Sequence, residues 1–178
     1  MEVYNHYLKK VEKEDVKNGT VIIPYDIWYV EQYAFKGLED LKTITIPVNV
    51  RRIKKFAFHE CKNLKYVNFM NDDCKIEDDI FIHCKNLEEV NLPMNLKKIY
   101  SCMFYNCKKL KKINVGNKLE KIGNLAFWGC ESLNQIKIPD SVEHIRIQYF
   151  ERCINLKKIY FHNYIYTYDD LFYYKKFK

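Results

Sequence analysis

Residues 104–127 read FYNCKKLKKINVGNKLEKIGNLAF, and this stretch decides the fold. It opens with Phe104 and ends on Phe127, the next member of a phenylalanine series that recurs every 23 residues. The complete series is Phe35, Phe58, Phe81, Phe104, Phe127 and Phe150. A strict period of this length is typical of a solenoid, in which each repeat buries its apolar face against its neighbours.

Other apolar columns follow each phenylalanine at fixed distances. Leucine stands six residues after every one, and isoleucine or valine stands nine residues after. Positions nine and eleven alternate with polar residues, which predicts a half-buried strand. Cysteine stands three residues after five of the six, at Cys61, Cys84, Cys107, Cys130 and Cys153. We expect these cysteines to form a buried, reduced column, because a free cysteine packs as a small apolar side chain.

The period divides the chain into three parts. Residues 18–173 form the repeat domain, with one partial repeat (18–34), five full repeats from Phe35 and a degenerate one from Phe150. Residues 1–17 are an N-terminal cap or tail, and residues 174–178 are a C-terminal tail. Val3, Tyr7, Leu8 and Val11 have roughly helical spacing, so we expect a short amphipathic helix over the first open edge. Asn18-Gly19 predicts a turn before the first repeat strand.

Two departures from the period carry expectations of their own. Asp73 interrupts an apolar column, which predicts that the second full repeat, residues 58–80, is the least regular unit. Near the C-terminus, Ile165, Tyr168 and Tyr173 keep the columns but tyrosine replaces aliphatic residues. Because terminal repeats are atypical, we expect a C-terminal cap here, with an aromatic docking patch as the alternative.

Charge is unevenly distributed along the chain. The net charge is +7, with +9 on residues 95–178 and −2 on residues 1–94. A basic half attracts anionic partners, although solvated lysines on a solenoid surface are the simplest explanation. The N-terminal residues lack the features of a secretory signal, and no apolar run is long enough for a membrane span. Together with an odd number of cysteines, seven, this predicts a cytoplasmic protein without a disulfide framework.

The repeat pattern resembles that of the BspA-like leucine-rich repeats. Residues 41–61 read LKTITIPVNVRRIKKFAFHEC, and residues 133–145 read LNQIKIPDSVEHI. The resemblance covers residues 18–173 and implies a right-handed solenoid with a curved parallel sheet, about 23 residues per repeat, and a protein-binding role. Many members of the family are surface or secreted proteins, so a surface-associated, adhesin-type fragment is the alternative. The family has no shared catalytic residues that could be carried over to this chain.

Catalytic and metal-binding patterns are missing from the sequence. No nucleophile elbow, zinc-protease motif or phosphate-binding glycine loop occurs. His59 and His83 lie near cysteines, but zinc sites normally need converging pairs of ligands at short spacing. The adjacent acids Asp72-Asp73, Asp78-Asp79 and Glu88-Glu89 are typical of solvated turns and surfaces. We therefore expect a protein that is not an enzyme and needs no cofactor or metal.

The polar residues interleaved in the predicted strands are the candidate binding residues. They stand eight and ten residues after each phenylalanine, and alternation places them on the solvent face of the sheet. They are Thr43, Thr45, Tyr66, Asn68, Glu89, Asn91, Lys112, Asn114, Gln135, Lys137, Lys158 and Tyr160. We call this set the strand face and expect it to bind another protein, an acidic one, because its chemistry runs from neutral through acidic to basic.

An anionic polymer, nucleic acid or glycan, bound by the lysine-rich C-terminal half is the alternative partner. A face that binds single-stranded nucleic acid should carry aromatic rings among its basic residues. The strand face meets this criterion only at Tyr160 beside Lys158, so nucleic acid is the less favoured choice.

Overall fold

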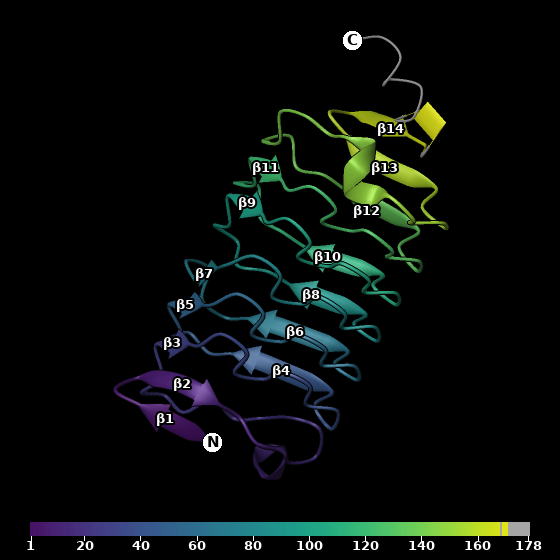
Figure 1. Cartoon of the computed structure of the whole chain (residues 1–178). Helices are drawn as coiled ribbons and strands as arrows, with labels where there is room; N and C mark the ends of the chain where they lie inside the picture. The colour runs from purple at the N-terminus through teal and green to yellow at the C-terminus, as the bar shows by residue number, and fades with distance from the viewer. Residues whose placement is uncertain (168, 171–178) are drawn as a thin grey trace.

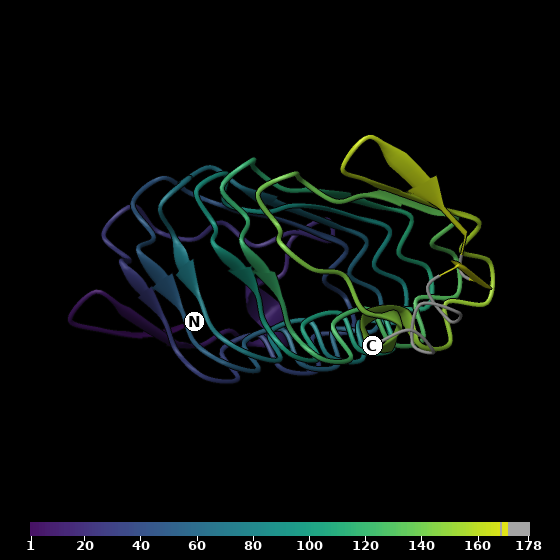
Figure 2. The same ribbon diagram turned by 90° about the horizontal axis from the view of Figure 1, so that it is seen from above.

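The computed structural model describes residues 1–167 and 169–170. Parallel strands pair from repeat to repeat in a β-solenoid of about 7 turns with about 23 residues per turn. Figure 1 shows the turns rising from the N-terminal hairpin to the C-terminal one, and Figure 2 shows them stacked one behind another. The predicted solenoid of leucine-rich-repeat type is confirmed.

The longer strands form one side of the solenoid. They are β4 (Thr43–Ile46), β6 (Tyr66–Phe69), β8 (Glu89–Asn91), β10 (Lys112–Asn114), β12 (Gln135–Lys137) and β13 (Lys158–Phe161). The first four pair in parallel, with each residue opposite the one 23 positions later. β12 and β13 pair in the same way but form a separate sheet with β14 (Tyr164–Tyr166), so the ladder is interrupted between β10 and β12 (Figure 1).

A second series of two-residue strands lies on another side of the solenoid. These are β3 (Tyr29–Val30), β5 (Arg52–Ile53), β7 (Lys75–Ile76), β9 (Lys98–Ile99) and β11 (Lys121–Ile122). β3, β5 and β7 pair in parallel, and β9 pairs with β11 in a separate sheet. The first residue of each strand faces outward and the second is buried, as expected for alternation along a strand.

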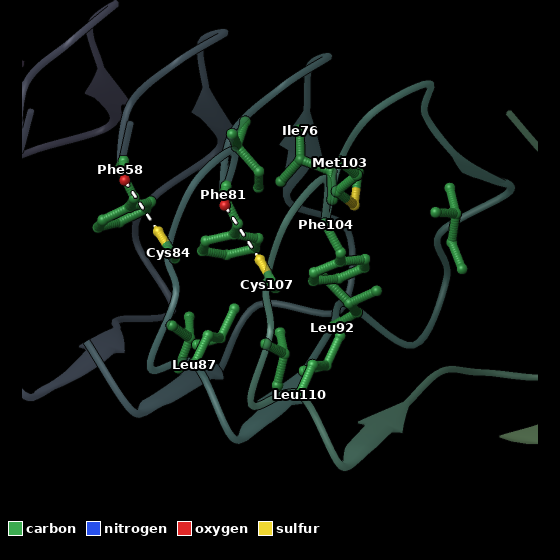
Figure 3. Close-up of a cluster of buried hydrophobic side chains, with 14 of the residues drawn as sticks. Phe58, Ile76, Phe81, Cys84, Leu87, Leu92, Met103, Phe104, Cys107 and Leu110 are labelled. Carbon is green, nitrogen blue, oxygen red and sulfur yellow. Dashed lines mark hydrogen bonds between the residues drawn. The ribbon is translucent and has the colours of Figure 1, made fainter. Parts of the chain in front are cut away.

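The phenylalanine column forms the centre of the core. All six rings are fully buried, and neighbouring rings stack along the axis with centroids 4.7–5.6 Å apart. Figure 3 shows three of them, Phe58, Phe81 and Phe104, with the leucine column beside them. Each ring therefore packs against the repeats before and after it, so every repeat depends on its neighbours for its stability.

The cysteine column makes hydrogen bonds as well as packing in the core. The thiol of Cys84 donates to the carbonyl oxygen of Phe58 at 3.0 Å, and that of Cys107 donates to Phe81 at 3.2 Å (Figure 3). The same bond recurs at Cys61, Cys130 and Cys153. Each of these carbonyl oxygens also accepts a backbone N–H bond within its own repeat, so the thiol supplies a second donor from the next repeat. A small apolar side chain that carries a donor suits this buried position, which gives a reason for the recurrence of cysteine. The predicted column of buried free thiols is confirmed.

We expect a single cysteine, Cys102, to react with a thiol reagent in the folded protein. The other six are buried, and burial raises the pKa of Cys61 and Cys74 to about 12, so few reactive thiolates form. Titration at mildly alkaline pH should give one slow equivalent, because burial and nearby acids also raise the pKa of Cys102. The remaining six should appear only in denaturant, and Cys102→Ser should abolish the native signal. Rapid native reaction of several thiols would show that the column is open to solvent.

Two columns of left-handed backbone flank the phenylalanine column, and the sequence did not reveal them. The position two residues after every phenylalanine of the series has positive φ, and so has the position two residues before all of them except Phe150, although most of these positions carry a side chain. They are Tyr33, Phe56, Asp79, Cys102 and Leu125 before, and Gly37, Glu60, His83, Asn106, Gly129 and Arg152 after. Only Gly37 and Gly129 are the residue type that this conformation favours, so the other nine side chains hold a strained backbone.

We predict that Glu60→Gly stabilises the protein by about 0.5–1 kcal/mol. Glycine relieves the left-handed strain in the folded state, and this gain is larger than the cost of the greater conformational entropy that glycine gives the unfolded chain. Glu60 has φ 57°, in the same column as Gly37 and Gly129, which have φ 70°. The urea midpoint should rise for Glu60→Gly and stay near or below the wild-type value for Glu60→Ala, which keeps the Cβ. Destabilisation by both substitutions to the same extent would mean that the side chain, not the backbone, decides stability here.

The predicted N-terminal helix is wrong. β1 (Glu2–Tyr4) and β2 (Tyr7–Lys10) form a hairpin, followed by one 3-10 turn at Lys13–Asp15. Asn5 and His6 both have positive φ and make the tight turn that two-residue hairpins favour. β2 pairs in parallel with β3, and Leu8 is buried in the core. The backbone hydrogen bonds available at the open edge of β3 therefore stabilise a strand here, despite the helical spacing of the apolar residues.

The apolar column that the sequence continues to Ile165 is not kept at that residue. The chain reverses at His162 and Asn163, which have positive φ, and β14 returns antiparallel to β13. Ile165 is consequently exposed on β14, so its predicted place in the column is wrong. Tyr168 and Tyr173 lie outside the described residues.

The least regular full repeat is the fifth, residues 127–149, and not the second as predicted. Its second strand is absent, and a 3-10 segment, Ile147–Phe150, follows. The second repeat keeps both strands because Cys74, one position after Asp73, is buried and fills the gap in the column.

Candidate functional site

The strand face consists of outward side chains on β4, β6, β8, β10, β12 and β13. Burial alternates along these strands, so the inner residues enter the core while all twelve strand-face residues are exposed or half-buried. Parallel pairing places equivalent residues opposite one another, for example Tyr66 beside Glu89 and Gln135 beside Lys158. The predicted binding residues thus lie in two rows that run along the solenoid axis.

One row contains a ladder of asparagine side chains. The Asn91 amide nitrogen donates to the Asn68 side-chain oxygen at 3.1 Å, and the Asn114 amide nitrogen donates to the Asn91 oxygen. Asn114 also donates to a carboxylate oxygen of Glu89 at 3.2 Å. These bonds fix the rotamers of the row over three repeats, so its central part is rigid before any partner arrives.

Ion pairs change the charge pattern that the sequence suggested. Lys112 and Glu89 on the strand face are 2.8 Å apart, and the adjacent pair Lys111 and Glu88 is also 2.8 Å apart. Lys97–Glu120 and Lys108–Glu131 pair elsewhere in the basic half. Among the described residues, Lys137 and Lys158 take part in no ion pair. Positive potential on the strand face is therefore concentrated on β12 and β13.

An exposed apolar ridge borders the strand face, and sequence reasoning missed it. It consists of Tyr25, Val48, Met70 and Met94, with exposed fractions of 82%, 60%, 59% and 48%. The last three lie just after β4, β6 and β8. Neighbouring turns are joined by backbone bonds from Met70 to Ile46 and from Asn95 to Asp72. Tyr66 of the strand face and Ile22, which stands 23 residues before Thr45, add exposed apolar surface. The recurrence of a large apolar residue within three positions after β4, β6 and β8 was the available signal.

Ligand groups for a metal do not converge within residues 1–167 and 169–170. No cluster of three or more histidine, cysteine, aspartate or glutamate side chains could hold an ion there. His59 and His83 stack edge to face with ring centroids 6.0 Å apart, and His83 pairs with the Asn106 amide at 3.1 Å. Burial lowers the pKa of His59, which favours the neutral form of its ring. No helix in the described part of the chain has the length and apolar character needed to cross a membrane.

The repeat geometry agrees with a match at the level of sequence families. Residues 13–130 and 74–178 match the BspA type leucine rich repeat region, in 6 copies. The chain belongs to the BspA-type leucine-rich repeat family. Comparison with curated proteins gives no significant match.

Solved structures of leucine-rich repeat proteins share the fold. The T. pallidum leucine-rich repeat protein is 27% identical, with a TM-score of 0.73, and the match covers 82% of this chain and 70% of that one. A leucine-rich cell surface protein of Faecalibacterium prausnitzii is 26% identical, with a TM-score of 0.67, over 83% of this chain and 42% of that one. A Bacteroides ovatus protein gives 23% identity and a TM-score of 0.64, over 78% of this chain. The chain spans 42% of the length of the last two proteins.

Proposed function

We propose that this BspA-type chain is a non-enzymatic protein-recognition module whose partner docks on the strand face and the adjoining apolar ridge. The observation that carries the proposal is the ridge itself. Single exposed apolar residues are normal, but large ones gathered along one edge are typical of a surface that binds protein. The family supports an interaction role, and solenoids commonly use an extended sheet face for binding.

The two ends of this surface differ in chemistry. Around β4, β6 and β8, the ridge, Ile22 and Tyr66 supply apolar contact area. Around β12 and β13, Lys137 and Lys158 supply positive charge. A partner that is apolar where it meets the first repeats and acidic where it meets the last ones complements both ends. The apolar part supplies affinity, and the charged part supplies orientation and a faster encounter.

The cellular location that this proposal favours is a reducing compartment. All seven cysteines are free, and the buried thiols act as hydrogen-bond donors in the core. The F. prausnitzii relative is described as a cell surface protein, so surface association is the competing location. Cell fractionation with an antibody against the chain separates the two locations.

Affinity capture from native lysate, followed by binding of the purified partner, tests the proposal. Val48→Asp/Met70→Asp should weaken the partner's affinity roughly tenfold or more, because each change places a charge in a desolvated apolar contact. Lys137→Glu/Lys158→Glu should slow association and remove most of its dependence on ionic strength. Lys42→Glu, outside both surfaces, is the control and should matter little. Equal effects from all three variants, with unchanged folding by circular dichroism, would refute the strand face as the docking surface.

A further inference from the structure

A second surface lies on the short strands, where cations stack in register. Arg52 is paired with Lys75 across β5 and β7, and Lys98 with Lys121 across β9 and β11. An open groove of about 490 Å³ at the break between β7 and β9 is lined by both Lys75 and Lys98, so the two pairs form one line. Neighbouring strands are about 4.8 Å apart, which sets the spacing between paired cations. We call these four residues the cation column.

The cation column makes no ion pair with the acids around it. In the described part of the chain, no ion pair involves any of its four members. Asp72, Asp73 and Glu77 border the groove, and each accepts a hydrogen bond from a group outside the column: the Met94 amide, the Asn95 side chain and the Lys55 amide. Like charges directly opposite one another destabilise a sheet. An anionic ligand that bridges them would offset this cost.

Several aromatic rings lie among these cations, whereas the strand face has one such ring, Tyr160 beside Lys158. Tyr29 is paired with Arg52 and stacks on Tyr7 at 4.7 Å, so two rings continue the column at its N-terminal end. The Arg51 guanidinium lies 4.5 Å from the Trp28 ring centroid, and the Lys98 ammonium lies 4.8 Å from the Tyr100 ring. A second open groove, of about 650 Å³, is lined by Tyr7, Tyr29 and Arg52 and adjoins the first.

We propose that the cation column binds single-stranded nucleic acid, with the phosphates along the cations and bases against the tyrosine end. A regular line of cations suits a ligand with one negative charge per unit, and aromatic rings beside a basic groove are the arrangement that such binders use. A sulfated glycan would use the charges but not the planar rings. This surface is separate from the strand face, so an experiment can refute the role proposed for one surface while that of the other stands.

Fluorescence anisotropy with a labelled dT12 oligonucleotide tests the assignment. Lys75→Gln/Lys98→Gln should weaken binding roughly tenfold at low salt and reduce the slope of log affinity against log salt by about 1.4, as expected for two lost phosphate contacts. Lys137→Gln/Lys158→Gln removes the same charge from the strand face and is the matched control. It should bind dT12 within about twofold of wild type if the contacts are local.

Four results would overturn the proposal. They are the absence of dT12 binding at about 50 mM salt, equal losses in the two double variants, binding of duplex DNA as tight as that of dT12, and binding of heparin that dT12 does not displace. The last would assign the column to a sulfated polymer. Circular dichroism and the urea midpoint establish that both variants remain folded, so a loss of binding reflects the surface alone.

Discussion

Phe104→Ala is expected to lower the free energy of unfolding by about 3–5 kcal/mol, the usual cost of removing a buried aromatic ring. Phe104 is fully buried, and its ring stacks on Phe81 at 5.6 Å and on Phe127 at 5.5 Å. Its truncation removes contacts in two interfaces at once, and a solenoid depends on those interfaces because single repeats are not stable alone. The urea midpoint measures the loss.

Phe150→Ala is the matched control for this prediction. Phe150 is also fully buried, but among the described phenylalanine rings it stacks face to face only on Phe127, at 5.4 Å. We expect a smaller loss, because one stacked interface is removed in place of two. A midpoint for Phe104→Ala close to that of wild type would mean that the phenylalanine column does not hold the repeats together.

Gly116→Ala is expected to cost about 3 kcal/mol or more, at or beyond the upper end of what overpacking a core costs. A Cβ on Gly116 would lie 1.7 Å from the carbonyl oxygen of Met94 and 2.6 Å from its carbon. Both atoms belong to the backbone of the preceding repeat, so no side-chain rotation relieves the clash. The third and fourth repeats must separate at the turn that carries Met94 of the apolar ridge. Chemical denaturation should show the loss of stability, and binding at the ridge should weaken as well.

Gly37→Ala separates close approach from backbone strain. Gly37 has φ 70°, but no atom lies within 4 Å of a Cβ built there. Its substitution should cost only the strain of a left-handed residue, about 1–2 kcal/mol. Should Gly37→Ala prove more damaging than Gly116→Ala, the contact with Met94 would not be what requires glycine.

The sequence was sufficient to predict the fold because every repeat of the solenoid buries equivalent residues in the same arrangement. The phenylalanine, leucine and cysteine columns each place the same residue type in the same buried environment in several repeats. A departure at a single position, such as Asp73, therefore does not hide the period. The ends lack this redundancy. Residues 1–17 contain one weak helical pattern, and the exposed edge of β3 outweighs it by pairing with β2.

The candidate surfaces were predicted only in part. Alternation along the strands identified the strand face, but not the Lys112–Glu89 pair, which depends on residues 23 positions apart meeting across two strands. The cation column depends on the same register, since Arg52, Lys75, Lys98 and Lys121 become a line only when the repeats stack. The left-handed columns could not be predicted because side chains occupy most positions where glycine would signal them.

Site-specific photo-crosslinking tests the central claim, that a protein partner docks on the strand face, most directly. A photoreactive amino acid at Asn68, in the middle of the strand face, should crosslink to the captured partner. The same group at Lys55, an exposed residue between β5 and Phe58 on another side of the turn, should not. Crosslinking from position 55 and none from position 68, with both variants folded, would contradict the account.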